Sequence, residues 1–329
     1  METSDFYGTE KVSRILLKIA PPVMLAQLIQ ALYNIVDSFF VGKYSETGLT
    51  ALSIIYPVQL LMIALGVGTG VGINTDMAYY LGIGKKKKAE EVAGTGTPLG
   101  LILWIIFAAV CYVTLPAYAG MSTDSPEVIR DVVAYGRIVC LFSIGLFTEG
   151  IWSKILQAEG DMRTPMIAQI AGAVVNIILD PLLIFGMLGM PEMGISGAAV
   201  ATVSGQIVAA LIVMKKAWYR SPRRSCYPGH IKRIYQLGIP NIIMQSAYTL
   251  YILGLNLILA GFSDQAVTAL GLYYKWQTFF FIPLGALQTC IVPVISYNYA
   301  AKDYKKVQAC IERFSDHGRM SDVSWYLVF

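Results

Sequence analysis

The sequence predicts an all-α, polytopic membrane protein. Of the 329 residues, 56% are hydrophobic and only 14% are charged, whereas an ordinary soluble domain carries roughly 25% charged residues. Apolar stretches long enough to cross the hydrocarbon of a bilayer, about 20 residues each, recur along the whole chain. Because backbone polar groups cannot stay unpaired in lipid, these stretches are expected to be helices.

We expect eight membrane-spanning helices, with boundaries uncertain by a few residues. They cover residues 15–41, 49–82, 95–117, 131–155, 166–188, 195–214, 237–260 and 266–298. The polar segment before them lacks the pattern of a cleavable signal peptide, so the first helix is expected to act as its own insertion signal. The five cysteines are spread out without CxxC spacing and predict neither a disulfide framework nor a metal site.

Lysine and arginine are concentrated in alternate loops. The rich loops include residues 85–88, 215–233 and 302–306, whereas the loops between them hold little besides Lys43 and the acidic stretch STDSPEVIRD. By the positive-inside rule, the rich loops face the cytoplasm. The sequence therefore predicts a multi-pass protein of the plasma membrane, the inner membrane in a bacterium, with a cytoplasmic N-terminus.

An internal repeat decides the expected architecture. A shift of 218 positions (240 − 22) aligns Pro22 with Pro240, and it aligns the TAL triplets at 50–52 and 268–270 without a gap. Helices 7 and 8 therefore repeat helices 1 and 2, and the repeating unit contains six helices. Paired units of the same topology, with a cavity between them, are a transporter design.

The repeat divides the chain into three parts. Residues 1–218 are expected to form a six-helix lobe with the cation site, and residues 219–313 the first two helices of a second, repeated lobe. The tail, residues 314–329, is polar and unlike anything before it. Since a second unit needs four more helices, we expect a chain truncated or frameshifted after the eighth helix.

Two aspartates inside the spans mark the candidate site. Asp37 lies in YNIVDSFFVG and Asp180 in NIILDPLLIFG, and a carboxylate in a span normally faces protein or water and has a partner. Asn176 shares a helix face with Asp180, and Pro181 loosens that helix because it lacks an amide hydrogen. These oxygen ligands suit a proton or a small hard cation such as Na⁺.

Helix rise places Thr202 at the same depth as Asp180, roughly 12 Å from the outer end of its helix, and Asp37 about 7 Å from its own. All three side chains could therefore meet in the outer half of one bundle. The alternatives are that either aspartate caps a frayed helix end in water and that Thr202 is a packing hydroxyl.

Other polar motifs carry weaker signals. Asp76 and Glu149 lie toward the cytoplasmic side, where wetted helix ends are common, and Glu149 is a candidate for the cytoplasmic half of a transport pathway. GVGTGVG at 66–72 lies within an apolar span and predicts close helix packing and not a phosphate loop. The two histidines lie in polar segments without a catalytic constellation, so we expect neither an enzyme nor a resident cofactor.

Four stretches resemble the multidrug and toxin extrusion (MATE) family, in particular its DinF-type branch. They are YNIVDSFFVG, LQAEGDMRTP, NIILDPLLIFG and GISGAAVATV, and the resemblance covers residues 10 to 313. It implies twelve helices in two lobes and a coupling site at Asp37, Asn176, Asp180 and Thr202. The resemblance also implies that Tyr135 takes part in this site. Tyr33, Asn34, Glu149 and Gln245 are further candidates for substrate binding or gating.

The resemblance implies export of small organic cations or drugs by alternating access, driven by inward H⁺ or Na⁺. The expected partners are these compounds and the lipid bilayer but not nucleic acid, with a monomer expected for a full-length chain. Another branch carries a carboxylate on helix 7, where this chain offers only amides. Two alternatives stay open: a related lipid-linked sugar flippase, and a truncated fragment that binds ligand but transports nothing.

Overall fold

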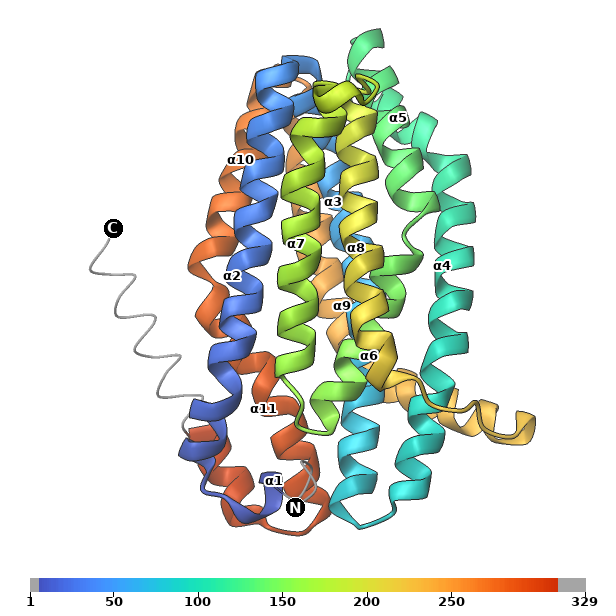
Figure 1. Cartoon of the computed structure of the whole chain (residues 1–329), viewed down its shortest axis with the longest axis vertical. Helices are drawn as coiled ribbons and strands as arrows, with labels where there is room; N and C mark the ends of the chain where they lie inside the picture. The colour runs from blue at the N-terminus through green and yellow to red at the C-terminus, as the bar shows by residue number, and fades with distance from the viewer. Residues whose placement is uncertain (1–5, 313–329) are drawn as a thin grey trace.

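The computed structural model describes residues 6–312, so the tail expected at 314–329 lies outside the described residues. Within that part the secondary structure is helical throughout, and the long helices run side by side along one axis (Figure 1). The all-α, polytopic fold class is therefore confirmed.

The helices follow one another with short connections. They are α1 (Phe6–Thr9), α2 (Val12–Tyr44), α3 (Glu46–Gly82), α4 (Lys86–Ser122), α5 (Pro126–Leu141), α6 (Ile144–Ala158), α7 (Arg163–Ile184), η2 (Met187–Gly189), α8 (Ile195–Ala217), η3 (Arg224–Cys226), α9 (Tyr227–Ala260), α10 (Asp264–Phe280) and α11 (Ile282–Ala300).

Six of the described helices are long and apolar enough to cross a membrane, or seven if the bent pair α5 and α6 counts as one span. Two of the eight expected spans differ from the prediction. The fourth, 131–155, is broken into α5 and α6 with a bend of 45°. The eighth, 266–298, is broken into α10 and α11, and neither half meets the length and hydropathy of a span.

Local chemistry explains both breaks. Ser143 Oγ donates to the carbonyl of Cys140 at 2.7 Å, and such a local bond competes with the helical backbone pattern. At the second break, Pro283 stands in the first turn of α11. It lacks an amide hydrogen, and its ring would clash with the carbonyl of Phe279 if α10 continued.

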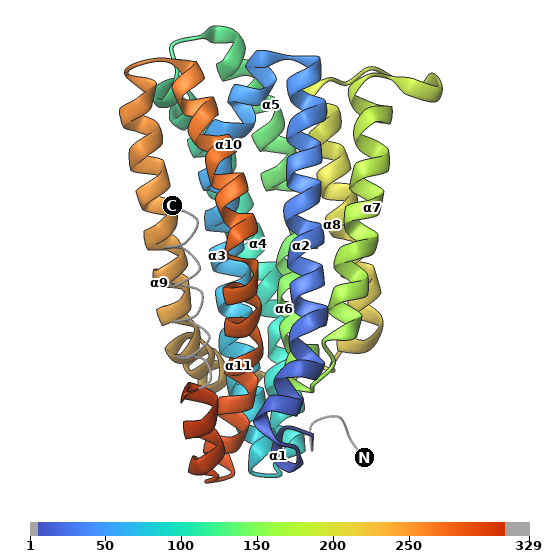
Figure 2. The ribbon, with the colours of Figure 1, turned by 90° about the vertical axis from the view of Figure 1, so that its left-hand side faces the viewer.

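Helix α3 is the centre of the bundle. It contacts α2, α4, α5, α6, α9, α10 and α11, and Figure 2 shows α9 on one side of α3, α7 and α8 on the other, and α10 in front. Glycines permit the closest approach. A Cβ atom added at Gly72 would lie 2.1 Å from the carbonyl oxygen of Ile234 in α9. The close helix packing predicted for residues 66–72 is therefore confirmed.

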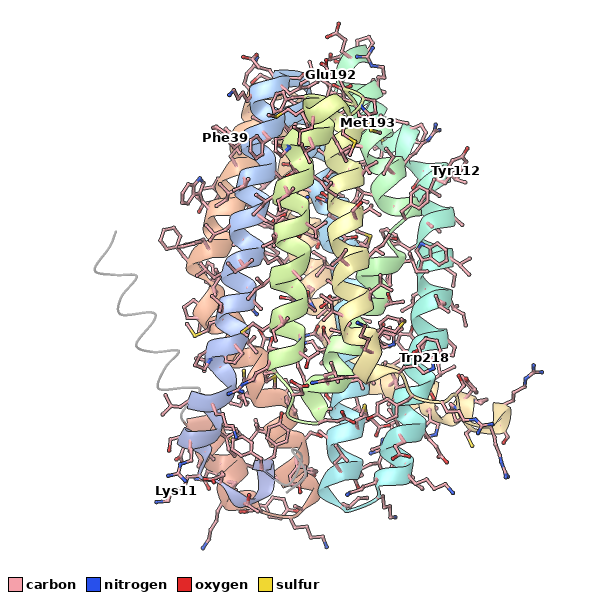
Figure 3. All side chains as sticks on the ribbon, in the orientation of Figure 1. Lys11, Phe39, Tyr112, Glu192, Met193 and Trp218 are labelled. Atoms are coloured by element: carbon pink, nitrogen blue, oxygen red, sulfur yellow. The ribbon has the colours of Figure 1, made fainter. Side chains whose placement is uncertain are left out.

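The outer faces of the bundle are apolar, as lipid requires. Val113 of α4 is 75% exposed and Leu250 of α9 is 65% exposed. Aromatic side chains such as Phe39 of α2 and Tyr112 of α4 also project outward (Figure 3). In a soluble protein so much exposed apolar surface would be a liability, whereas hydrocarbon solvates it well.

Basic residues gather at one end, which we call the lysine-rich end. It carries α1, the turn between α3 and α4 with Lys85–Lys88, and Lys302, Lys305 and Lys306 after α11, and it is the lower end in Figure 1. The other end, called the opposite end, carries the turns between α2 and α3, α4 and α5, and α9 and α10.

Asp161 organises the start of α7 at the lysine-rich end. Its carboxylate accepts hydrogen bonds from the backbone amides of Arg163 and Thr164 and from Lys216 Nζ. Burial disfavours its charge, but the bonds from Thr164 and Lys216 outweigh that effect and hold the pKa of Asp161 below its ordinary value. The carboxylate thus acts much as a helix cap does.

Asp161→Ala is expected to lower the stability of the folded protein by about 1 kcal/mol, measured as thermal unfolding in detergent at pH 7. Because the pKa is lowered on folding, this contribution is present above the pKa of the unfolded carboxyl, about 4, and is lost as the pH falls through the folded pKa. Asp124→Ala, at an exposed acid of the opposite end, is the control. Equal melting temperatures for the two variants would contradict the prediction.

Candidate cation and substrate site

Three helices bring the predicted site residues together. Asp37 comes from α2, Asn176 and Asp180 from α7, and Thr202 from α8. Asn176 Nδ2 donates to Asp180 Oδ1 at 3.4 Å and to Thr202 Oγ1 at 3.5 Å. The charge of Asp37 interacts with that of Asp180. The structure therefore places all four residues in one cluster between α2, α7 and α8.

Both carboxylates of this cluster are buried. Asp180 is 0% exposed and Asp37 is 5% exposed, so neither caps a helix end in water. Burying a carboxylate is costly unless a proton, a cation or a donor compensates it. The cluster therefore has the electrostatic property that a coupling site requires.

Some oxygen atoms of the cluster still have acceptor capacity. Asn176 Oδ1 and Asp180 Oδ2 are buried and receive no hydrogen bond from the described residues. Two carboxylates with amide and hydroxyl oxygens suit a proton or a hard cation. The described residues contain no group of three or more His, Cys, Asp and Glu side chains that could hold a metal ion.

Small residues make this arrangement possible. Gly172 of α7 and Gly205 of α8 face each other so closely that a Cβ atom at Gly205 would lie 2.5 Å from the Gly172 carbonyl oxygen and 3.3 Å from Asn176 Cβ. Backbones approach this closely only where side chains are absent. The glycine pair thus sets the distance between Asn176 and Thr202.

Tyr135 of α5 connects the cluster to α3. It is 1% exposed, and its hydroxyl accepts a hydrogen bond from Gln59 Nε2 at 3.3 Å and also hydrogen-bonds with Thr202. Tyr33, one turn before Asp37, lies near both aspartates. Gln59 was not predicted as a site residue, although a glutamine within an apolar span is a detectable signal.

A cavity of about 600 Å³ adjoins the cluster. Its wall contains Tyr33, Asn34, Tyr135, Thr202 and Gln245 of the predicted set. Glutamine and tyrosine side chains dominate the rest of the polar wall: Gln27, Gln30, Tyr56, Gln59, Gln206, Tyr248 and Gln277. No charged side chain lines this cavity among the described residues. It offers aromatic faces and amide groups to a bound molecule.

A second cavity of about 170 Å³ shares Tyr33 and Thr202 with the first and reaches Glu149. Glu149 Oε1 accepts hydrogen bonds from Ser153 Oγ at 2.6 Å and from Gln169 Nε2 at 3.4 Å. Glu149 is thus held inside the bundle between α6 and α7. The expectation of a wetted helix end at Asp76 is wrong, because Asp76 is 0% exposed and forms an ion pair with Arg233.

The sequence model of the MatE family matches residues 22–182 and 240–314, which together make up more than half of the chain. The chain belongs to the MATE family. The two matches begin 218 positions apart (240 − 22), which is the offset at which the sequence repeats.

Curated relatives are transporters. A FAD transporter of Shewanella oneidensis is 25% identical over 88% of this chain and 66% of the relative. A probable multidrug resistance protein, NorM, of Thermotoga maritima is 27% identical over 88% of this chain and 64% of the relative. The multidrug export protein MepA of Staphylococcus aureus is 26% identical over 98% of this chain and 70% of the relative. The chain thus spans about two thirds of the length of these proteins.

Solved MATE structures share the fold. A MATE multidrug transporter, DinF-BH, solved in complex with a small ligand, superposes with a TM-score of 0.89 at 25% identity, covering 96% of this chain and 72% of that one. A transporter of the MOP superfamily from Pyrococcus furiosus superposes with a TM-score of 0.86 at 22% identity, covering 98% of this chain and 73% of that one. The resemblance to the MATE family, including a DinF-type neighbour, is confirmed.

Proposed function

We propose that this protein exports small organic cations or drugs, driven by an inward gradient of H⁺ or Na⁺ that acts at Asp37 and Asp180. The observation that carries the proposal is the buried carboxylate cluster beside the 600 Å³ cavity. Multidrug proteins among the relatives support it. In this proposal the lysine-rich end faces the cytoplasm, because basic loops stay on that side.

The coupling follows from electrostatics. Binding of H⁺ or Na⁺ from outside neutralises Asp37 and Asp180, which removes the attraction between the cluster and a cationic substrate in the cavity and favours its release outward. Rocking of the two repeat units then returns the coupling ion to the cytoplasm. The membrane potential contributes about 2.3 kcal/mol per charge per 100 mV.

The neutral cavity wall indicates which class of substrate the cavity could bind. Tyrosine faces attract cations, and amide oxygens accept hydrogen bonds from ammonium groups. A lipid-linked sugar carries phosphate, which would need basic side chains in the cavity. Since none of the described lining residues is basic, export of organic cations is favoured over a flippase function.

Energised cells that express the chain provide the test of this proposal. We expect them to accumulate less ethidium than cells without it, and we expect the difference to disappear with a protonophore if H⁺ drives export, or with a Na⁺ ionophore if Na⁺ does. Equal accumulation in both cell types would refute export. Ethidium binding by the purified chain without any effect on accumulation would identify a fragment that binds ligand but transports nothing.

Tyr135→Phe is expected to lower the rate of export about fivefold, because it removes the hydroxyl that joins Gln59 to Thr202 and a hydrogen bond of this kind contributes about 1 kcal/mol. The measurement is the initial rate of ethidium efflux at equal protein levels. Tyr118→Phe is the matched control, since its hydroxyl donates to the Ile54 carbonyl at 2.6 Å, away from the cluster. Equal rates for the two variants would argue against a role for Tyr135.

A further inference from the structure

An ion pair with a buried carboxylate joins α3 to α9 near the lysine-rich end. Arg233 Nε lies 2.5 Å from Asp76 Oδ1, and the side chain of Asp76 is 0% exposed. The guanidinium of Arg233 also stacks over the rings of Tyr79 and Tyr80, at 4.6 Å and 5.0 Å from their centroids. Arg233 is the one ion-pair partner of Asp76 among the described residues.

The ion pair lies where the two repeat units touch most closely. Helix α3 belongs to the first unit and α9 to the second, and their backbones meet at glycines: Gly72 against Ile234, and Gly238 against Gly68, where an added Cβ would lie 2.7 Å from the Gly68 carbonyl oxygen. Such contact leaves no room for water. A path that runs between α3 and α9 at this end can open only if these two helices separate.

The opposite end is held by different chemistry. There Thr50 Oγ1 and Thr268 Oγ1 share a hydrogen bond of 2.8 Å, and these residues are 218 positions apart, so equivalent positions of the two repeats meet each other. The ion pair has no such counterpart. The positions equivalent to Asp76 and Arg233 are Val294 and Ile15, which are apolar. Among the described residues, an ion pair joins α3 to α9 at the lysine-rich end, whereas threonine hydroxyls join the units at the opposite end, Thr50 to Thr268 and Thr123 to the carboxylate of Asp264.

We propose that the Asp76 and Arg233 pair is a latch that holds the lysine-rich end closed and so determines which side of the membrane the cavity faces. This inference rests on the alternating access of the proposed function. Arg233 has a 39% exposed side chain and can reach water when the pair breaks. Asp76 is then a buried carboxylate that has lost its ion-pair partner, which is costly. That cost opposes opening toward the lysine-rich end.

Asp76→Asn removes this cost, because a neutral amide at position 76 no longer needs Arg233. A cysteine at position 69 (Thr69→Cys) reports whether α3 and α9 have separated. Thr69 is 0% exposed and lies against Tyr235 of α9, so a thiol there reacts only when α3 and α9 separate. Cys226, the one native cysteine of the described chain that is not fully buried, is first changed to Ser in every variant.

The experiment measures how fast a membrane-impermeant maleimide alkylates Thr69→Cys from the lysine-rich side in sealed membrane vesicles. Asp76→Asn is expected to raise this rate roughly tenfold, which lies within the range of changes that allosteric coupling typically produces. Glu91→Gln is the matched control. It breaks another pair between α4 and α9 at this end, in which Glu91, with a 34% exposed side chain, lies 3.7 Å from His230, which is charged only when protonated, so this partly exposed pair is expected to contribute less than the Asp76 pair.

An unchanged alkylation rate in Asp76→Asn, or an equal increase in Glu91→Gln, would overturn the latch. Arg233→Gln leaves Asp76 buried without its partner and is expected to lower the yield of inserted protein, whereas the double variant Asp76→Asn/Arg233→Gln should recover the yield and alkylate as fast as Asp76→Asn. Alkylation does not depend on transport. A chain that moves no ethidium yet shows this pattern would refute the proposed export and support the latch.

Discussion

Asp180→Asn is expected to abolish gradient-driven efflux while the protein still inserts into the membrane. Asp180 is fully buried and interacts with the charge of Asp37. An asparagine keeps the shape of the side chain, and its amide oxygen can still accept the 3.4 Å hydrogen bond from Asn176 Nδ2. The variant cannot change charge, however, and the coupling ion then has no effect on the affinity of the cavity for a cation.

Ethidium efflux from everted vesicles, normalised to the amount of inserted protein, measures this effect. Asp37→Asn should give the same result, and the double variant should be no worse than either single one, because the two carboxylates act as one site. Asp131→Asn, at a partly exposed acid of the opposite end that accepts a bond from Thr47, is the control. Wild-type rates in Asp180→Asn would contradict the assignment of the site.

Gly205→Val is expected to have the second large effect, the loss of folded protein. The new side chain would begin 2.5 Å from the Gly172 carbonyl oxygen, so α7 and α8 would have to move apart, and overpacking of this kind costs roughly 1–3 kcal/mol or more. The same movement would separate Asn176 from Thr202. We expect both a lower melting temperature in detergent and the loss of export by any protein that remains.

Gly120→Val is the matched control for that substitution. No atom lies within 4 Å of a Cβ added at Gly120 in α4, so a valine there meets no steric obstacle, and it has no cost in helix propensity because glycine is the poorer helix former. If both variants fold equally well, the close contact between α7 and α8 does not support the site. A normal yield of Gly205→Val with normal export would lead to the same conclusion.

The predictions from sequence succeeded where one strong physical rule decided the outcome. Lipid requires helices, and that rule identified the long spans. The cost of a carboxylate in lipid pointed to Asp37 and Asp180, and helix geometry placed Asn176 beside Asp180. The depth of Thr202 was enough to bring it to the same cluster.

The predictions from sequence were wrong where contacts between distant parts of the chain determine the structure. The breaks at Ser143 and Pro283 divide spans that hydropathy alone predicts to be continuous. Asp76 was expected near water because its partner, Arg233, is 157 positions away in the sequence (233 − 76), and no local pattern predicts such a pair. Gln59 was missed for a similar reason, since its role depends on Tyr135 in another helix.

The most direct test of cation-coupled export is to measure both fluxes in the same proteoliposomes. The purified chain is reconstituted, an H⁺ or Na⁺ gradient is imposed, and ethidium and the ion are followed together. We predict that ethidium moves against its own gradient only while the ion gradient lasts, that the ion moves in the opposite direction, and that Asp180→Asn stops both movements. Ethidium movement that is independent of the gradient and unchanged in Asp180→Asn would contradict the account.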